Sequence, residues 1–238
     1  MASHIDLGGL RIAVVKKDIK NVHLSVYPPA GKVRIAAPLD MELDTIRVFA
    51  ISKLAWIKGQ QRKIVAQERE TPRDYVNRES HYVWGRRYLL SVIEHDAPPA
   101  IELKRNRLVL RLRPGTEELR RQEVLDAWYR EQIRAAVPEL LIKWERHMKV
   151  KAARFFVQRM KTKWGSCNPL SRSIRLNTDL AKKPPECLEY IVVHELAHLI
   201  EPTHNARFMA LMDLFMPKWR HLQDELNRLP VRHEDWVY

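Results

Sequence analysis

The chain contains few cysteines, no long apolar segment and no recognisable targeting sequence. Its two cysteines, Cys167 and Cys187, lie far apart among 238 residues and form no C-x-x-C pair. This usage does not indicate a disulfide framework, so we expect a reducing compartment, the cytoplasm. No apolar run approaches the roughly 20 residues that a membrane-spanning helix needs. The first residues also lack the basic and apolar regions of a signal peptide, so we expect no membrane partner.

The charge is strongly positive and unevenly distributed. The formal net charge is +13, and residues 151–183 contain nine Lys or Arg residues against a single acid, Asp179. The nine are Lys151, Arg154, Arg159, Lys161, Lys163, Arg172, Arg175, Lys182 and Lys183. Cations clustered beside an active site raise the local concentration of anionic substrates, which fits a nucleotide, a nucleic acid or an acidic peptide as partner. The alternative is a solvated basic face that only aids solubility.

The segment from His194 to His198 reads H-E-L-A-H, which matches the H-E-x-x-H pattern. Residues i and i+4 lie on one face of a helix, so His194 and His198 can direct ring nitrogens at one metal ion. Glu195 then lies beside the metal, where a general base that activates water is needed. The apolar residues that precede it predict a buried helix. The pattern therefore indicates a catalytic metal site that holds Zn²⁺ or another divalent ion.

The third metal ligand requires a break in the helix. In an uninterrupted helix His204 would lie about 280° around from His194. Pro202 disfavours helical geometry at Glu201, so we expect the helix to end near Ile200 and Thr203 to cap a new helix from about His204. This turn would return His204 to the metal. A downstream carboxylate remains the alternative third ligand, and the candidates are Asp213, Asp224 and Glu225.

The pattern of apolar runs and turn residues predicts an α+β fold. The predicted strands are residues 10–15, 22–27, 33–35, 81–84, 87–93, 101–103, 108–112, 153–158 and 173–177. The predicted helices are residues 41–68, 116–149, 184–200, 204–215 and 217–228. We find no internal repeat. Residues 1–149 are expected to form a strand-rich N-terminal region with two long helices, and residues 150–238 a metallohydrolase domain with a small sheet beside the active-site helix.

Four segments together resemble the YgjP-like metal-dependent hydrolases, which are also described as M48-type or zincin-like metallopeptidases. The segments are residues 163–167 (K-W-G-S-C), 174–177 (I-R-L-N), 190–198 (Y-I-V-V-H-E-L-A-H) and 204–208 (H-N-A-R-F). The resemblance implies zinc held by His194, His198 and His204, with Glu195 as the catalytic base. It also implies that residues 164–168 form a strand or turn beside the site. There Ser166 and Asn168 either orient substrate or support the ligands, or they belong to a purely structural turn.

Two reactions fit this site. In a metallopeptidase, zinc polarises the scissile carbonyl, and Glu195 moves a proton from water to the leaving amine. Some relatives of the family resemble nucleoside triphosphate pyrophosphatases that act on UTP. In that alternative the basic residues Lys161, Lys163 and Arg175 neutralise phosphate charge, and Trp164 is a further candidate for substrate binding.

A third class of function is a nucleic-acid-binding module in which zinc is only structural. Its fourth zinc ligand would have to come from Cys167 or Cys187. Glu195 argues against this class, because a closed structural site needs no base.

Overall fold

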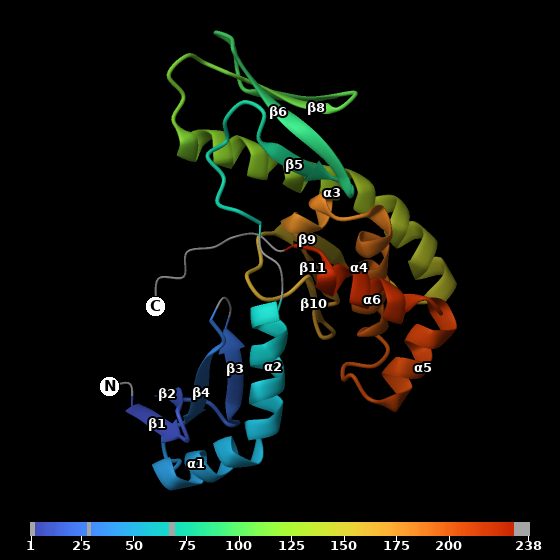
Figure 1. Cartoon of the computed structure of the whole chain (residues 1–238). Helices are drawn as coiled ribbons and strands as arrows, with labels where there is room; N and C mark the ends of the chain where they lie inside the picture. Colours follow the sequence, from blue (N-terminus) through green and yellow to red (C-terminus); the bar gives the residue numbers. More distant parts are fainter. Residues whose placement is uncertain (1–2, 28–29, 67–69, 231–238) are drawn as a thin grey trace. The chain divides into compact units, whose positions relative to one another are not determined.

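The structure is a computed structural model that describes residues 3–27, 30–66 and 70–230. The chain forms two compact units, and the boundary between them lies between Glu70 and Thr71 (Figure 1). Each unit has a hydrophobic core of its own. Among the described residues, no helix is both long and apolar enough to cross a membrane.

The first unit is a four-stranded sheet with two helices. Its strands are β1 (Ser3–Leu7), β2 (Leu10–Lys17), β3 (His23–Tyr27) and β4 (Lys32–Pro38). They lie in the order β1-β2-β4-β3, with β2 and β4 parallel and both outer pairs antiparallel. The predicted helix over 41–68 is in fact two helices, α1 (Leu43–Ser52) and α2 (Leu54–Ala66), because the backbone of Lys53 leaves the helical region at φ −103° and ψ 6°.

The second unit begins with a sheet of the same topology. Its strands are β5 (Ser80–Val83), β6 (Arg86–Glu94), β7 (Ala100–Lys104) and β8 (Arg107–Leu112). The order β5-β6-β8-β7 and the strand directions repeat those of the first sheet. The fold therefore contains a structural repeat that the sequence does not reveal.

Helix α3 (Glu118–Met148) connects the second sheet to the rest of the unit. It confirms the long helix predicted over 116–149, and Pro138 lies within it. Its apolar face includes Leu125, Tyr129 and Ile133, all buried, and the hydroxyl of Tyr129 donates a hydrogen bond to the carbonyl of Tyr82 on β5 at 2.9 Å.

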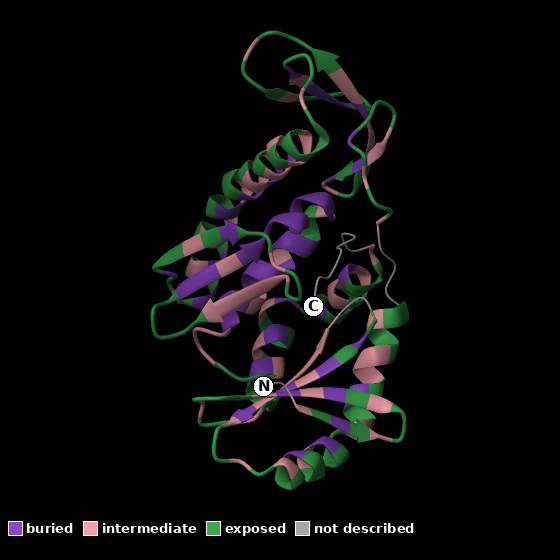
Figure 2. Ribbon diagram, turned by 90° about the vertical axis from the view of Figure 1, so that its left-hand side faces the viewer, coloured by how far each residue is buried: buried purple, intermediate pink, exposed green. Residues whose placement is uncertain are grey.

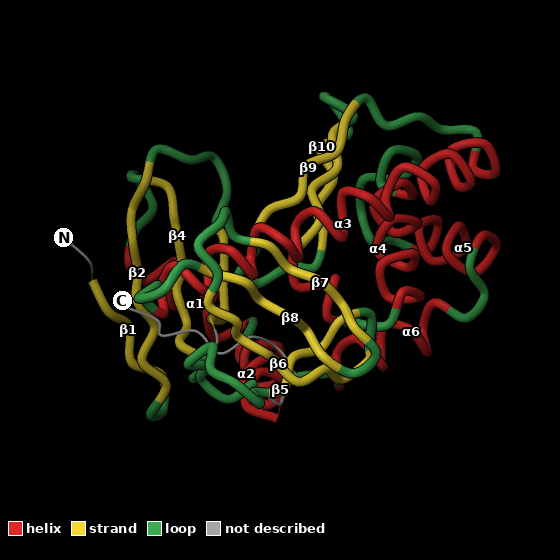
Figure 3. The backbone as a smooth tube through the Cα atoms, turned by 90° about the horizontal axis from the view of Figure 1, so that it is seen from above, coloured by secondary structure: helices red, strands yellow, loops and turns green. Residues whose placement is uncertain are grey.

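The last part of the chain forms a small sheet followed by helices. Its elements are β9 (Arg154–Gln158), β10 (Gly165–Asn168), β11 (Ser173–Asn177), the 3₁₀ helix η1 (Thr178–Lys182), α4 (Pro185–Ala197), α5 (Ala206–Phe215) and α6 (Trp219–Arg228). The strand order is β10-β11-β9, with β9 parallel and β10 antiparallel to β11. Helices α4, α5 and α6 pack together (Figure 3). The α+β fold class is thus as predicted, with several small mixed sheets and six helices among the described residues.

A single core joins the second sheet, α3 and the last elements, so the predicted division after residue 149 does not coincide with the boundary in the structure. Helix α3 packs along both η1 and α4, and the β5–β6 turn docks on η1. In that turn the amide of Trp84 donates to the carbonyl of Ala181 at 2.8 Å. Gly85 has φ +75°, and a Cβ there would lie 3.0 Å from Pro184. The buried residues fill the interior of each unit (Figure 2).

Candidate metal centre and catalytic site

Helix α4 places both histidines and the glutamate of the H-E-x-x-H segment. Pro185 and Glu186 lie in its first turn. Proline is favoured there because no backbone donor is needed, and an acidic side chain is favoured by the helix dipole. Nine of its residues are buried, so the helix is packed on nearly all sides. The predicted buried helix is confirmed, although it ends at Ala197 rather than near Ile200, with His198 as its C-cap.

The turn after α4 returns the chain to the helix face. Glu201 organises this turn, because its carboxylate accepts hydrogen bonds from the amide and the hydroxyl of Thr203 at 3.3 and 2.9 Å. Helix α5 then begins at Ala206 with Asn205 as its N-cap, whose side chain accepts from the amide of Phe208 at 3.0 Å. The predicted cap at Thr203 is wrong, because its hydroxyl is already bonded to Glu201.

The turn brings the three predicted ligands together. The Nε2 atoms of His194 and His204 are 3.0 Å apart, and one ligand nitrogen from each of the three histidines lies within 4.8 Å of the others. The buried ring of Phe208 contacts all three imidazoles, with centroid distances of 5.0, 4.6 and 4.7 Å to His194, His198 and His204. Phe208 therefore forms an apolar wall for the cluster, a role that the sequence analysis did not assign.

The donor set fits a zinc ion. Two nitrogens that each lie about 2.0–2.1 Å from one tetrahedral zinc are about 3.3 Å apart, close to the spacing of His194 and His204. The Nδ1 of His198 lies 3.1 Å from the carbonyl of Glu201, which selects the tautomer that leaves Nε2 free for a metal. Burial lowers the pKa of His194 to about 3, and the neighbouring histidines add to this effect. The imidazole is therefore neutral, as a metal ligand must be.

Glu195 is buried against strand β10. Its side chain is 3% exposed, and burial raises the pKa of the carboxyl to about 8, while the charge of Lys163 acts in the opposite direction. Among the described residues, Oε2 has no hydrogen-bond partner. Gly165 makes room for this side chain, because a Cβ at Gly165 would lie 2.5 Å from Oε1 of Glu195. An unpaired buried carboxylate oxygen beside the three-histidine cluster suits a group that takes up a proton during a reaction.

Asn177 holds the segment that carries Lys163 and Trp164. Its buried amide donates to the carbonyls of Met160 and Lys163, both at 2.8 Å, and its own backbone amide donates to the carbonyl of Trp164 at 2.9 Å. The side-chain oxygen also accepts from the amide of Asp179 and caps η1. The sequence analysis included Asn177 in the resemblance but did not identify this role.

The predicted substrate residues do not share one surface. Successive residues of a strand point to opposite faces. Gly165 faces Glu195, so Ser166 and its cross-strand partner Arg175 lie on the opposite face of the sheet. Among the predicted substrate residues, Lys163 is the one whose positive charge lowers the pKa of Glu195.

The remaining candidates have other surroundings. The side chain of Asn168 accepts from the amide of Ser171 at 3.0 Å and closes the β10–β11 turn. The ring of Trp164 lies 5.6 Å from the buried ammonium of Lys183. Lys161 is exposed in the connection between β9 and β10.

The alternative ligands do not join the histidines. Among the described residues, the three histidines are the one group of His, Cys, Asp or Glu that can hold a metal, and it includes none of the three carboxylates named above. Asp213 already accepts from the indole of Trp219 at 2.8 Å and pairs with Arg220. Cys167 and Cys187 also lie outside the group, and burial raises the pKa of their thiols to about 11 and about 12.

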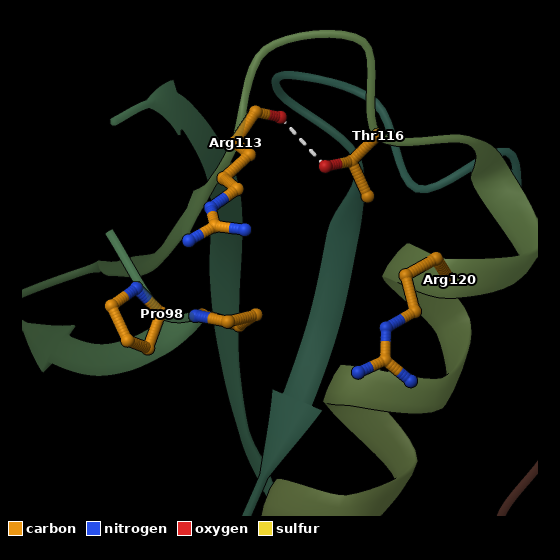
Figure 4. A pocket seen from close by; sticks show the side chains of 5 residues that line it. Pro98, Arg113, Thr116 and Arg120 are labelled. Atoms are coloured by element: carbon orange, nitrogen blue, oxygen red, sulfur yellow. Dashed lines mark hydrogen bonds between the residues drawn. The ribbon is translucent and has the colours of Figure 1, made fainter. Parts of the chain in front are cut away.

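A cavity of about 330 Å³ lies elsewhere in the second unit (Figure 4). It is lined by Pro98, Pro99, Arg113, Thr116 and Arg120. Its two arginines pair with Asp96 and Glu123, at 3.4 and 2.7 Å. None of these residues belongs to the elements that carry the histidines, so the cavity is not part of the candidate site.

Two histidines at the C-terminal end of α4 and a third in the turn that follows, with a buried glutamate next to the first, are the arrangement of a metal-dependent hydrolase. Comparison with protein families identifies the family. Residues 20–229 match the YgjP-like metallopeptidase domain, so the chain belongs to this family. It is therefore a metal-dependent hydrolase, and its family implies a divalent metal and a peptide substrate.

Two solved structures are similar to part of the chain. The metallopeptidase zymogen abylysin of Pyrococcus abyssi has 21% identity and a TM-score of 0.36, covering 38% of this chain and 90% of its own. The zymogen jannalysin of Methanocaldococcus jannaschii has 22% identity and a TM-score of 0.32, covering 40% of this chain and 92% of its own. A comparison with curated proteins gave no match.

Proposed function

We propose that the protein is a zinc-dependent peptidase in which His194, His198 and His204 hold the ion and Glu195 is the general base. The observation that carries this proposal is the unpaired, buried Oε2 of Glu195 beside the three-histidine cluster. A closed structural site would need a fourth protein ligand and no base at this position. The family supports a peptide as the substrate.

The chain's own residues supply the proton transfer and the substrate alignment. When bound, zinc polarises the scissile carbonyl as a Lewis acid and favours the ionised form of Glu195. Oε2 of Glu195 then takes a proton from the attacking water and delivers it to the departing amine. Strand β10 is the outer strand next to α4, so its free edge can pair with an extended peptide through backbone hydrogen bonds.

The nucleotide hypothesis has a weaker basis in this geometry. It depended on Lys161, Lys163 and Arg175 as a joint phosphate site, and Arg175 lies on the face of the sheet opposite Glu195. We therefore propose peptide hydrolysis alone. The experiment also includes UTP, so that hydrolysis of a nucleotide would be detected.

The test combines metal content with turnover. Zinc-loaded protein is incubated with unfolded casein and, separately, with UTP. We expect cleavage of casein, loss of turnover by at least about 100-fold in Glu195→Gln with zinc retained, and loss of both zinc and turnover in His204→Ala. The matched controls are Glu186→Gln on the exposed start of α4 and His221→Ala on α6, which should keep both. Hydrolysis of UTP but not casein would overturn the proposal, and so would full activity of Glu195→Gln.

A further inference from the structure

The face of the β9–β11 sheet opposite Glu195 carries a cationic and aromatic cluster. Arg154 and Phe156 lie on β9, and Arg175 lies beside Phe156 on β11. The guanidinium carbons of Arg154 and Arg175 are 5.4 and 5.7 Å from the centre of the Phe156 ring. The ring remains 41% exposed. We call these three residues the Arg–Phe face.

The segment of sequence that carries the Arg–Phe face contains no acidic residue. No Asp or Glu occurs between Arg146 and Thr178. Within the described part of the chain, neither Arg154 nor Arg175 forms an ion pair, unlike Arg113 and Arg120, which line the cavity of Figure 4. The face therefore presents uncompensated positive charge around an exposed aromatic ring.

The charge extends along the end of the sheet where β9 and β11 begin. Exposed Arg172 precedes β11, and its Nε donates to the carbonyl of Lys151 at 2.8 Å. The amide of Ala153 in turn donates to the carbonyl of Arg172 at 2.8 Å. The first of these bonds ties the guanidinium of Arg172 to the backbone beside the Arg–Phe face, so this charge has a defined position.

We propose that the Arg–Phe face binds a single-stranded nucleic acid. Such ligands combine phosphates, which pair with arginines, and bases, which stack on exposed aromatic rings of a sheet. A duplex would keep its bases stacked on one another, so the ring of Phe156 would gain no base partner from it. An acidic peptide would satisfy the charges but would likewise leave the ring without a partner. The surface lies on the opposite side of the sheet from Glu195, so this proposal stands independently of the peptidase reaction.

The test measures the binding of a fluorescent oligouridylate of about 12 nucleotides by anisotropy, with an oligothymidylate and a DNA duplex of the same length beside it. Three phosphate contacts predict a slope of about −2 in log affinity against log salt, which is about a 20-fold loss between 50 and 200 mM salt. Phe156→Leu should weaken binding by about 5- to 100-fold because one stacked base is lost, and Phe156→Tyr should restore it.

Two variants with the same change in net charge distinguish binding at the Arg–Phe face from non-specific attraction to a basic protein. Arg154→Glu should weaken binding by about 5-fold or more and flatten the salt slope by about 0.7. Arg134→Glu on the exposed side of α3 makes the same change in net charge and should leave binding as it was. Casein cleavage by Arg154→Glu and Phe156→Leu should equal that of the wild type.

Four outcomes would overturn the proposal: no binding of either oligonucleotide, tighter binding of a duplex than of both single strands, equal losses in Arg154→Glu and Arg134→Glu, or full binding by Phe156→Leu. The last would point to an acidic peptide or a general polyanion instead.

Discussion

A single methyl group added at Gly165 should displace the carboxylate of Glu195. The new Cβ would lie 2.5 Å from Oε1 and 2.9 Å from Cγ of Glu195, and 2.8 Å from Cγ2 of Ile191. Ordinary carbon–oxygen contacts need more than 3 Å, so the carboxylate must retreat by about 1 Å. A misplacement of this size costs about 100-fold in rate, and overpacking costs about 1–3 kcal/mol of stability. The backbone of Gly165 is outside the left-handed region, so alanine adds no backbone strain.

The measurement compares kcat, zinc content and stability in Gly165→Ala. We expect kcat to fall by about 100-fold with one zinc still bound, because the three histidines are not touched by the added methyl group. The matched control is Ser166→Ala, one residue along the same strand on the opposite face, which should keep kcat. A folded, zinc-loaded Gly165→Ala protein with the wild-type kcat would refute the reasoning that this contact positions the base.

Three further predictions concern the rest of the site. Phe208→Leu should lower zinc affinity by about 10-fold, measured by chelator competition, because the wall shared by the three imidazoles becomes incomplete. Asn177→Ala should lower the free energy of unfolding in urea by about 1–3 kcal/mol, because the carbonyls of Met160 and Lys163 lose the donor that the buried Asn177 amide supplies. Without metal, Glu195 should lower stability by about 3–5 kcal/mol as the pH rises from 4.5 to 8, because its folded pKa, about 8, exceeds the unfolded value and the folded state favours the protonated carboxyl. The lowered pKa of His194 acts in the opposite direction. The difference between wild type and Glu195→Gln in urea titrations in EDTA should therefore show the Glu195 contribution.

The helix that carries His194 and His198 could be predicted because its pattern is local. The spacing of His194 and His198 depends only on helical periodicity, and the return of His204 depends on a break that Pro202 signals. The cap of the next helix was predicted at Thr203 but is Asn205, because both residue types favour the N-cap position. The choice between them is made by the carboxylate of Glu201, which already holds Thr203.

Contacts between distant segments could not be predicted. Gly165 and Glu195 are 30 residues apart, and only the packing of β10 on α4 shows why the smallest residue is required. The clustering of cations in residues 151–183 was visible in the sequence, but its division between the two faces depends on the register of β10 with β11. The repeated sheet topology was also hidden, because a strand order is set by pairing and not by sequence similarity.

The register of β10 assigns opposite tasks to neighbouring residues. Gly165 pairs with Leu176 on the face toward Glu195, whereas Ser166 pairs with Arg175 on the face that carries Phe156. A slip by one residue would turn Ser166 toward Glu195 and Gly165 away from it. Asn177 opposes such a slip, because its backbone and side chain bond to the residues just before β10. The hydrogen bonds of the buried Asn177 amide therefore maintain the space beside Gly165 that Glu195 occupies. Because side chains alternate along the strand, they also keep the Arg–Phe face on the opposite side of the sheet.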